Sequence, residues 1–272
     1  MKISICNELF VNWDFERIIK YIAMLGYNGI EIAPFTLCDN VKDFTLEQRR
    51  SIRRVAENYN IEIVGTHWLL VKPPGLHIFL PEARERTKDY LIELIKFTHD
   101  IGGSIMVFGS PKQRNIPKGI SKEKAYEIAK RLFKECSRVA QEYDVTICIE
   151  PLSHDQTNFI NNAKEAVKLI ELVNEPNFKL ILDVRSMFDE KEPHEKIIRK
   201  YGKYLAHFHA NNDTGLGPGL GRARYEKIIK ALLDIGYNGF LSVEVFDFSL
   251  GPRYIAERSI FYLRKYLGVM CY

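Results

Sequence analysis

The sequence lacks the features that mark exported, membrane-bound and disulfide-stabilised proteins. It contains no run of about 20 apolar residues, which is the length that a bilayer span needs. The N-terminal segment carries Asn7, Glu8 and Asp14 where a secretory leader would be apolar. The five cysteines are scattered, odd in number and never form a CxxC pair. We therefore expect a cytoplasmic protein with neither a disulfide framework nor a structural thiolate zinc site.

A strong charge imbalance and internal linkers are missing as well. The formal net charge is +4 and no basic block stands out, so we expect neither a nucleic-acid partner nor a membrane partner. The chain has 272 residues, of which 46% are hydrophobic and 27% are charged, a composition typical of a globular protein with a large core. No Pro/Gly/Ser-rich stretch divides it, so we predict one domain over residues 1–272.

Short apolar runs alternate along the chain with longer segments of helical periodicity. Apolar residues recur at helical spacing in segments 15–23, 90–97, 125–136 and 228–233, as in helices that pack one face against a sheet. Eight such units predict a parallel sheet that closes into a single (β/α)8 TIM barrel, an α/β fold. An open doubly wound sheet usually has a glycine-rich phosphate fingerprint, and the sequence has none. The predicted strands cover residues 2–6, 29–33, 61–68, 104–109, 145–150, 179–183, 204–209 and 240–245.

Turn signals agree with this alternation. Gly26 and Gly236 follow helical patterns and precede strands, where a left-handed residue ends a helix. Ser121 is placed to begin a helix. The stretches LGYNGIEI and IGYNGFLSVEV nearly repeat the same helix–turn–strand unit before the second and eighth strands.

Four successive predicted strands each end in a side chain that can bind a metal. VTICIE ends at Glu150, KLILD at Asp183, LAHFH at His209 and FLSVE at Glu244. Their separations are each about one strand–helix unit, so all four should meet at the carboxyl ends of the strands, where barrel enzymes keep their active sites.

Three carboxylates and one imidazole need a compensating charge if they converge. Like charges in a partly dry cleft raise their own pKa values or attract a cation. Oxygen and nitrogen ligands together suit one divalent metal ion, Mn²⁺, Co²⁺ or Mg²⁺, with Zn²⁺ as an alternative. Independent polar residues at the barrel rim are the simpler interpretation, which the regular spacing disfavours.

The segments ICIEPLSHDQTNFINNAKEA, LILDVRSMF, HFHANNDTGLGPGLG and GYNGFLSVEVF resemble the xylose-isomerase-like superfamily. Within it they are most similar to the sugar-phosphate isomerase/epimerase group that includes ketose 3-epimerases. The resemblance implies that Glu150, Asp183, His209 and Glu244 bind the metal and that Glu150 and Glu244 are the catalytic acid–base pair. It also implies a small sugar or sugar-phosphate substrate, enediolate proton transfer, and a homodimer or homotetramer.

The resemblance is weaker around the substrate. Ketose 3-epimerases have a substrate-binding His where this chain has Ser186, an Arg where it has Gly215, and a Glu where it has Gln156. Arg222 is a candidate to replace the missing Arg. Because related barrels include hydroxypyruvate isomerases and inosose dehydratases, isomerisation, epimerisation and dehydration all stay open.

Other polar residues near the strand ends are candidates for contacting substrate. An imidazole and an indole end the third strand and suit a sugar, and Lys112 and Arg114 offer cations for a phosphate or carboxylate. Glu31 either reaches substrate or forms an ion pair inside the barrel mouth. We predict that His207 orients His209. The predicted substrate-binding residues are His67, Trp68, His154, Gln156, Ser186, Lys112, Arg114 and Arg222.

Two other function classes compete with a sugar isomerase. Apurinic endonucleases share the predicted fold, but they need a three-metal cluster with more histidines, and Gly109 and Ser186 stand at two of the positions concerned. A sugar-binding protein without activity would not require both Glu150 and Glu244. We therefore expect a metal-dependent sugar isomerase or epimerase.

Overall fold

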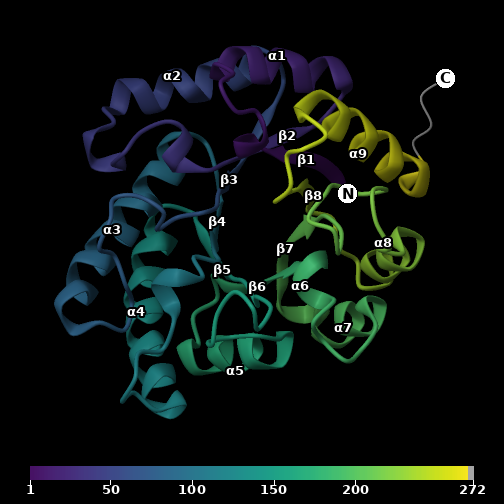
Figure 1. The fold of residues 1–272 in the computed structure, drawn as a ribbon. Helices are drawn as coiled ribbons and strands as arrows, with labels where there is room; N and C mark the ends of the chain where they lie inside the picture. The colour runs from purple at the N-terminus through teal and green to yellow at the C-terminus, as the bar shows by residue number, and fades with distance from the viewer. Residues whose placement is uncertain (269–272) are drawn as a thin grey trace.

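Eight parallel strands close into a barrel in the computed structural model, which describes residues 1–268 (Figure 1). Each strand pairs with its neighbours in sequence, and β8 pairs with β1, so the predicted (β/α)8 barrel is confirmed. No helix within these residues is long and apolar enough to cross a membrane. The strands are β1 Lys2–Cys6, β2 Gly29–Ile32, β3 Glu62–Thr66, β4 Ile105–Phe108, β5 Thr146–Ile149, β6 Phe178–Asp183, β7 Leu205–Ala210 and β8 Phe240–Val243.

Helices surround the barrel as an outer ring (Figure 1). Gly26, with φ of 84°, ends α1, and the Ser121 hydroxyl accepts a hydrogen bond from Lys124 N–H at the start of α4, as the turn signals predict. The ring differs from the expected eight helices by α6, a single turn that follows β6 directly, where the Asp183 carboxylate accepts from Ser186 N–H. The helices are α1 Phe15–Leu25, α2 Leu46–Glu57, α3 Pro81–Asp100, α4 Lys122–Glu142, α5 Ala163–Val173, α6 Val184–Met187, α7 His194–Tyr201, α8 Tyr225–Asp234 and α9 Pro252–Leu267.

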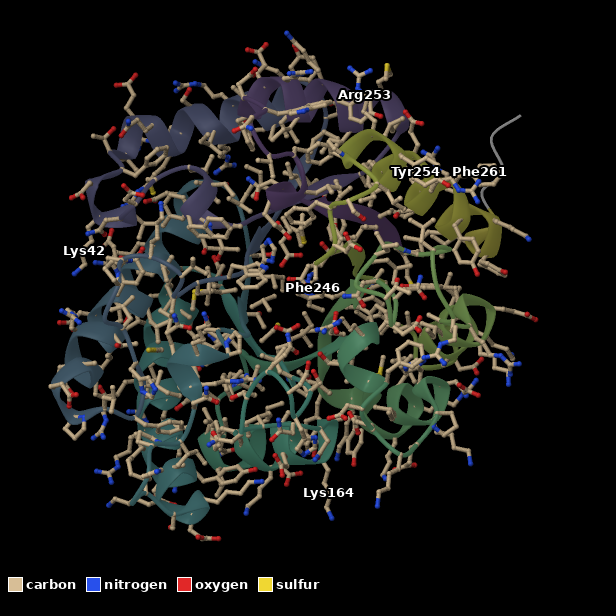
Figure 2. All side chains as sticks on the ribbon, in the orientation of Figure 1. Lys42, Lys164, Phe246, Arg253, Tyr254 and Phe261 are labelled. Atoms are coloured by element: carbon tan, nitrogen blue, oxygen red, sulfur yellow. The ribbon has the colours of Figure 1, made fainter. Side chains whose placement is uncertain are left out.

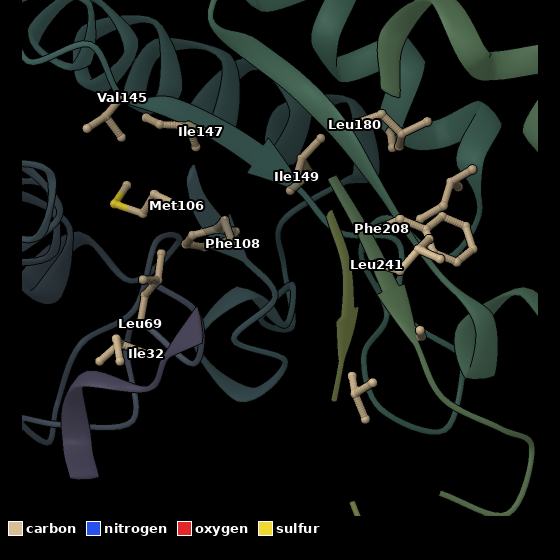
Figure 3. Packing of buried hydrophobic residues seen from close by; sticks show 14 of the residues in the cluster. Ile32, Leu69, Met106, Phe108, Val145, Ile147, Ile149, Leu180, Phe208 and Leu241 are labelled. Carbon is tan, nitrogen blue, oxygen red and sulfur yellow. The ribbon is translucent and has the colours of Figure 1, made fainter. Parts of the chain in front are cut away.

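The core has an outer layer and a small inner one. Ile147 and Ile149 of β5 pack outward in the large cluster between strands and helices (Figure 3). Cys148, between them, packs inside the barrel with Val107 and Ile181. Because β5 is buried on its outer side and on its inner side, its residues are apolar on both faces. The alternation also fixes the direction of the polar side chains that follow each strand.

Five strands, β2, β3, β4, β5 and β8, end one or two residues earlier than predicted, and in three of them the shortening leaves a candidate site residue in the loop that follows. β3 ends at Thr66, so His67 and Trp68 lie beyond it. Trp68 has a φ of 52°, a left-handed backbone conformation that is incompatible with a strand. β5 ends at Ile149 and β8 at Val243, which leaves Glu150 and Glu244 as the first residues after their strands.

Candidate active site

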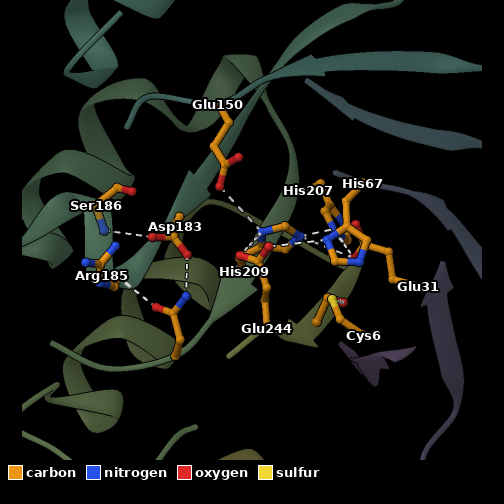
Figure 4. A network of polar contacts seen from close by, with 12 residues as sticks. Cys6, Glu31, His67, Glu150, Asp183, Arg185, Ser186, His207, His209 and Glu244 are labelled. Carbon is orange, nitrogen blue, oxygen red and sulfur yellow. Dashed lines mark hydrogen bonds and ion pairs between the residues drawn. The ribbon is translucent and has the colours of Figure 1, made fainter. Parts of the chain in front are cut away.

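Glu150, Asp183, His209 and Glu244 converge at the carboxyl ends of β5 to β8 (Figure 4). Each offers a ligand atom, and these atoms all lie within 4.8 Å of one another. All four residues are buried. The structure therefore brings together the four side chains that strand-end position selects, and we call them the four-residue cluster.

The electrostatics of the four-residue cluster fit a divalent cation. His209 Nδ1 lies 3.0 Å from Glu244 Oε2 and 3.5 Å from Glu150 Oε1. Among residues 1–268, neither His209 Nδ1 nor Glu244 Oε2 has a hydrogen-bond partner, although both are buried. Burial, Glu150 and Glu244 together raise the pKa of Asp183 to about 7. A cation at this point would satisfy the orphaned atoms and relieve the repulsion among the carboxylates.

Glu31 lies behind His209 and fixes the direction of its ring. His209 Nε2 is 3.2 Å from Glu31 Oε1, and His207 Nε2 is 2.8 Å from Glu31 Oε2. Burial raises the pKa of Glu31, but the opposite effect of His207 and His209 is larger. The pKa of Glu31 therefore lies well below its usual range. A carboxylate that accepts from Nε2–H leaves Nδ1 free to bind a metal. Of the two roles considered for Glu31, the internal ion pair is the one seen. His207 contacts the same carboxylate as His209, and its role in orienting His209 stays a prediction.

Glu8, which the sequence patterns did not single out, lies on the other side of the cluster. His67 Nδ1 is 3.2 Å from Glu244 Oε1, and His67 Nε2 is 3.0 Å from Glu8 Oε2. Burial lowers the pKa of His67, but Glu8 and Glu244 outweigh it and raise the pKa to about 10. Because Glu8 follows β1 in a short turn, the strand-end rule that selected the other acids would also have found it.

A small pocket of about 20 Å³ lies beside Glu150 and Glu244 of the four-residue cluster. His67, Trp68, Gln156 and Phe246 line it, and contact of the first three with substrate stays a prediction. Figure 2 places Phe246 toward the centre of the ring of strands. In the part of the chain described, the buried Trp68 Nε1 has no hydrogen-bond partner, so it offers a donor to a polar ligand.

Gly109 makes room for one of the glutamates. A Cβ added at this position would lie 2.3 Å from Glu150 Oε2, closer than real contacts allow. Any side chain here would push the Glu150 carboxylate out of its place beside His209. The glycine that argued against a three-metal cluster therefore also has a steric role.

The other predicted substrate residues lie outside the pocket. Ser186 is buried, and its N–H donates to Asp183 Oδ1 (2.7 Å). His154 is exposed and lies against Asp189, and Lys112 is exposed on its loop. Arg222 pairs with Asp213 at the surface (2.7 Å).

The predicted substrate contact by Arg114 needs correction. Its guanidinium is fully buried and donates to the carbonyl oxygens of Glu150 (2.7 Å), Ile160 (3.4 Å) and Phe108 (3.5 Å). Burial lowers the pKa of Arg114 to about 9, against the opposing effect of Glu150. The Phe108, Glu150 and Ile160 carbonyls thus accept from the two Nη atoms, and Arg114 braces the backbone around Glu150.

Comparisons with known proteins agree with this geometry. The family model described as "Xylose isomerase-like TIM barrel" matches residues 19–266. The chain is 28% identical over 240 residues to a D-psicose 3-epimerase of Ruminiclostridium cellulolyticum, covering 86% of this chain and 78% of that protein. It is 23% identical to a fructoselysine 3-epimerase of Escherichia coli O157:H7, covering 90% of each. A solved D-psicose 3-epimerase with D-tagatose, from Clostridium cellulolyticum H10, superposes with a TM-score of 0.86 at 25% identity over the whole of both chains.

Proposed function

The chain belongs to the xylose isomerase-like TIM barrel family, and on that premise we propose that it is a divalent-metal-dependent epimerase or isomerase of a small hydroxy-carbonyl sugar. Its relatives over most of its length are sugar epimerases and isomerases, so the chain is an enzyme. The observation that carries the proposal is the buried four-residue cluster, in which His209 Nδ1 and Glu244 Oε2 find no partner among residues 1–268.

Glu150, Asp183, His209 and Glu244 would hold the ion. When bound there, a divalent metal polarises a carbonyl and a neighbouring hydroxyl of the substrate, which makes the proton on the adjacent carbon more acidic. The choice among Mn²⁺, Co²⁺, Mg²⁺ and Zn²⁺ stays a prediction, as do the dimer or tetramer and the cytoplasmic location.

Glu150 and Glu244 would move the proton. They follow β5 and β8, so they approach the pocket from different strands with Asp183 and His209 between them. One carboxylate takes the proton from carbon, and the other carboxyl returns a proton. Return to the opposite face of the same carbon gives epimerisation, and return to the adjacent carbon gives isomerisation. Which glutamate acts first depends on the handedness of the substrate.

Neighbouring side chains would keep these groups in place. His67 Nδ1 contacts the Glu244 carboxylate, and the Arg114 guanidinium donates to the Glu150 carbonyl oxygen. Trp68 and Phe246 supply an apolar wall, with ring centres 6.2 Å apart, that can cover a sugar face and exclude water.

Deuterium wash-in tests the proposal. Purified protein with Mn²⁺ is incubated in deuterated water with ketoses, aldoses, their phosphates and inososes, and each product is examined by NMR and mass spectrometry. We expect one carbon-bound deuterium in a recovered sugar or its epimer. A dehydratase would instead give a product lighter by one water, and no exchange with any compound would refute the proposal.

A variant pair links the exchange to the site. Glu244→Gln should abolish exchange while substrate binding stays detectable, because the amide cannot accept the proton. Glu226→Gln, at an exposed position of α8, is the matched control and should exchange normally. Normal exchange by Glu244→Gln would contradict its acid–base role.

A further inference from the structure

Arg185 carries a guanidinium beside the pocket that the proposed proton transfer does not use. It lies in α6 between Asp183 and Ser186, on the side of the four-residue cluster away from Glu31 (Figure 4). Its backbone N–H donates to Asn211 Oδ1 (2.8 Å), which ties the turn to the loop after β7. Arg185 Cζ lies 5.0 Å from the centre of the Phe246 ring. Because Phe246 lines the pocket, the planar cation stacks on one of its walls.

The contacts of Arg185 come from both sides of the barrel mouth. Its backbone follows β6, Phe246 follows β8, and Arg185 Nη2 lies 3.9 Å from Asp155 Oδ2 in the loop after β5. Asp155 precedes the pocket residue Gln156. The guanidinium therefore lies at the rim between the strands that supply Glu150 and Glu244.

The guanidinium N–H groups of Arg185 make no hydrogen bond to other residues in the described part of the chain. A separation of 3.9 Å is too long for a hydrogen bond, and the Asp155 side chain is 69% exposed. Among the residues with described positions, no atom accepts a hydrogen bond from the Arg185 side chain, which is itself only 27% exposed. Arg114 and Arg222, by contrast, donate to carbonyls and to Asp213.

We propose that Arg185 binds an anionic group of the substrate, a carboxylate or a phosphate ester, and so selects acidic ketoses over neutral ones. The inference rests on the proposed function for the reaction and concerns the end of the substrate remote from the reacting carbons. Buried carboxylates around the pocket repel an anion, and a cation at the rim offsets that repulsion. The arginine fork presents paired N–H donors that match the oxygens of a carboxylate or phosphate.

The test compares D-fructose, D-fructose 6-phosphate and D-fructuronate in the wash-in assay with Mn²⁺. We expect kcat/KM to be higher for an acidic ketose than for D-fructose, and the compound preferred distinguishes phosphate from carboxylate. Arg185→Gln should lower kcat/KM for that acidic ketose about 10- to 100-fold more than for D-fructose, the loss expected for charge-assisted hydrogen bonds. The matched control is Arg138→Gln, an exposed arginine of α4 paired with Glu175 before β6, which should not change the preference. A preference for D-fructose, or equal losses for all three compounds, would overturn the proposal.

Calorimetric binding separates failure of this inference from failure of the reaction. Dissociation constants of the three compounds are measured with Mn²⁺ on wild type, Arg185→Gln and Asp155→Asn. We expect Arg185→Gln to weaken binding of the acidic ketose, and Asp155→Asn to strengthen it by removing a competing charge. If nothing exchanges deuterium but these affinities change as stated, the reaction is wrong and the anion subsite stands. If wild type and Arg185→Gln bind the acidic compounds equally, the subsite is wrong.

Discussion

Replacing Asp183 with asparagine removes a carboxylate that destabilises the metal-free protein. The same carboxylate is one of the four groups proposed to bind the metal. Burial, Glu150 and Glu244 raise the pKa of Asp183 from 3.8 to about 7. Between these values the folded chain binds more protons than the unfolded chain, so stability falls as the pH rises, and the full loss is present above pH 7. For a pKa raised from 3.8 to about 7, the loss of stability above pH 7 is about 4 kcal/mol.

Asparagine removes this unfavourable charge, but part of the stability gained is lost again through hydrogen bonding. Asp183 Oδ1 accepts from Ser186 N–H, and Oδ2 accepts from Asn211 Nδ2. An asparagine amide leaves one of these donors without an acceptor, which costs about 1–3 kcal/mol. We therefore expect Asp183→Asn to stabilise the chelated protein at pH 8 by about 1–3 kcal/mol, a rise in Tm of about 2–5 °C for a chain of this size.

Thermal unfolding with EDTA and with Mn²⁺ measures both effects. Wild type should gain about 2.7 kcal/mol when Mn²⁺ is present at one hundred times its Kd, and the variant should gain almost nothing. Asp89→Asn, at an exposed position of α3, controls for the loss of one negative charge. A chelated Asp183→Asn protein that is less stable than wild type, or an equal rise of both melting temperatures with Mn²⁺, would contradict this expectation.

Three further predictions test neighbouring parts of the site. Gly109→Ala should lower kcat/KM at least about tenfold with the fold retained by circular dichroism, because its Cβ displaces the Glu150 carboxylate; unchanged kinetics would contradict this packing. Arg114→Met should destabilise the protein by about 3 kcal/mol or more in urea unfolding, because buried carbonyls lose their donor; a loss below about 0.5 kcal/mol would contradict the bracing role. Mn²⁺ should bind at least about tenfold more tightly at pH 8 than at pH 6, because Asp183, with a pKa of about 7, must lose its proton first; calorimetry showing equal affinity would count against the shifted pKa.

The barrel and the four-residue cluster could be predicted because both follow from local rules. Alternation of apolar runs with helical segments determines the number of strands, and the two-residue period of a strand determines which side chains point inward. Glu150, Asp183, His209 and Glu244 each follow such a run, so their meeting requires only that the strands lie parallel in one closed sheet.

The surroundings of the cluster could not be predicted in the same way. Arg114 and Arg185 both follow strands, and a long flexible side chain can turn into the wall or toward the mouth without any change in sequence pattern. The buried carbonyls of β4 and β5 decide this for Arg114, and α6, which forms where Asp183 caps a turn, decides it for Arg185. Such contacts are set by tertiary packing.

The number of divalent ions bound by each chain tests the central claim most directly. Chelated protein is loaded with excess Mn²⁺, dialysed and analysed by inductively coupled plasma mass spectrometry, for wild type and for His209→Asn. We expect about one ion per chain in wild type and almost none in the variant, because the four-residue cluster offers one site. No bound ion in wild type, two or three ions per chain, or an undiminished ion in His209→Asn would contradict it.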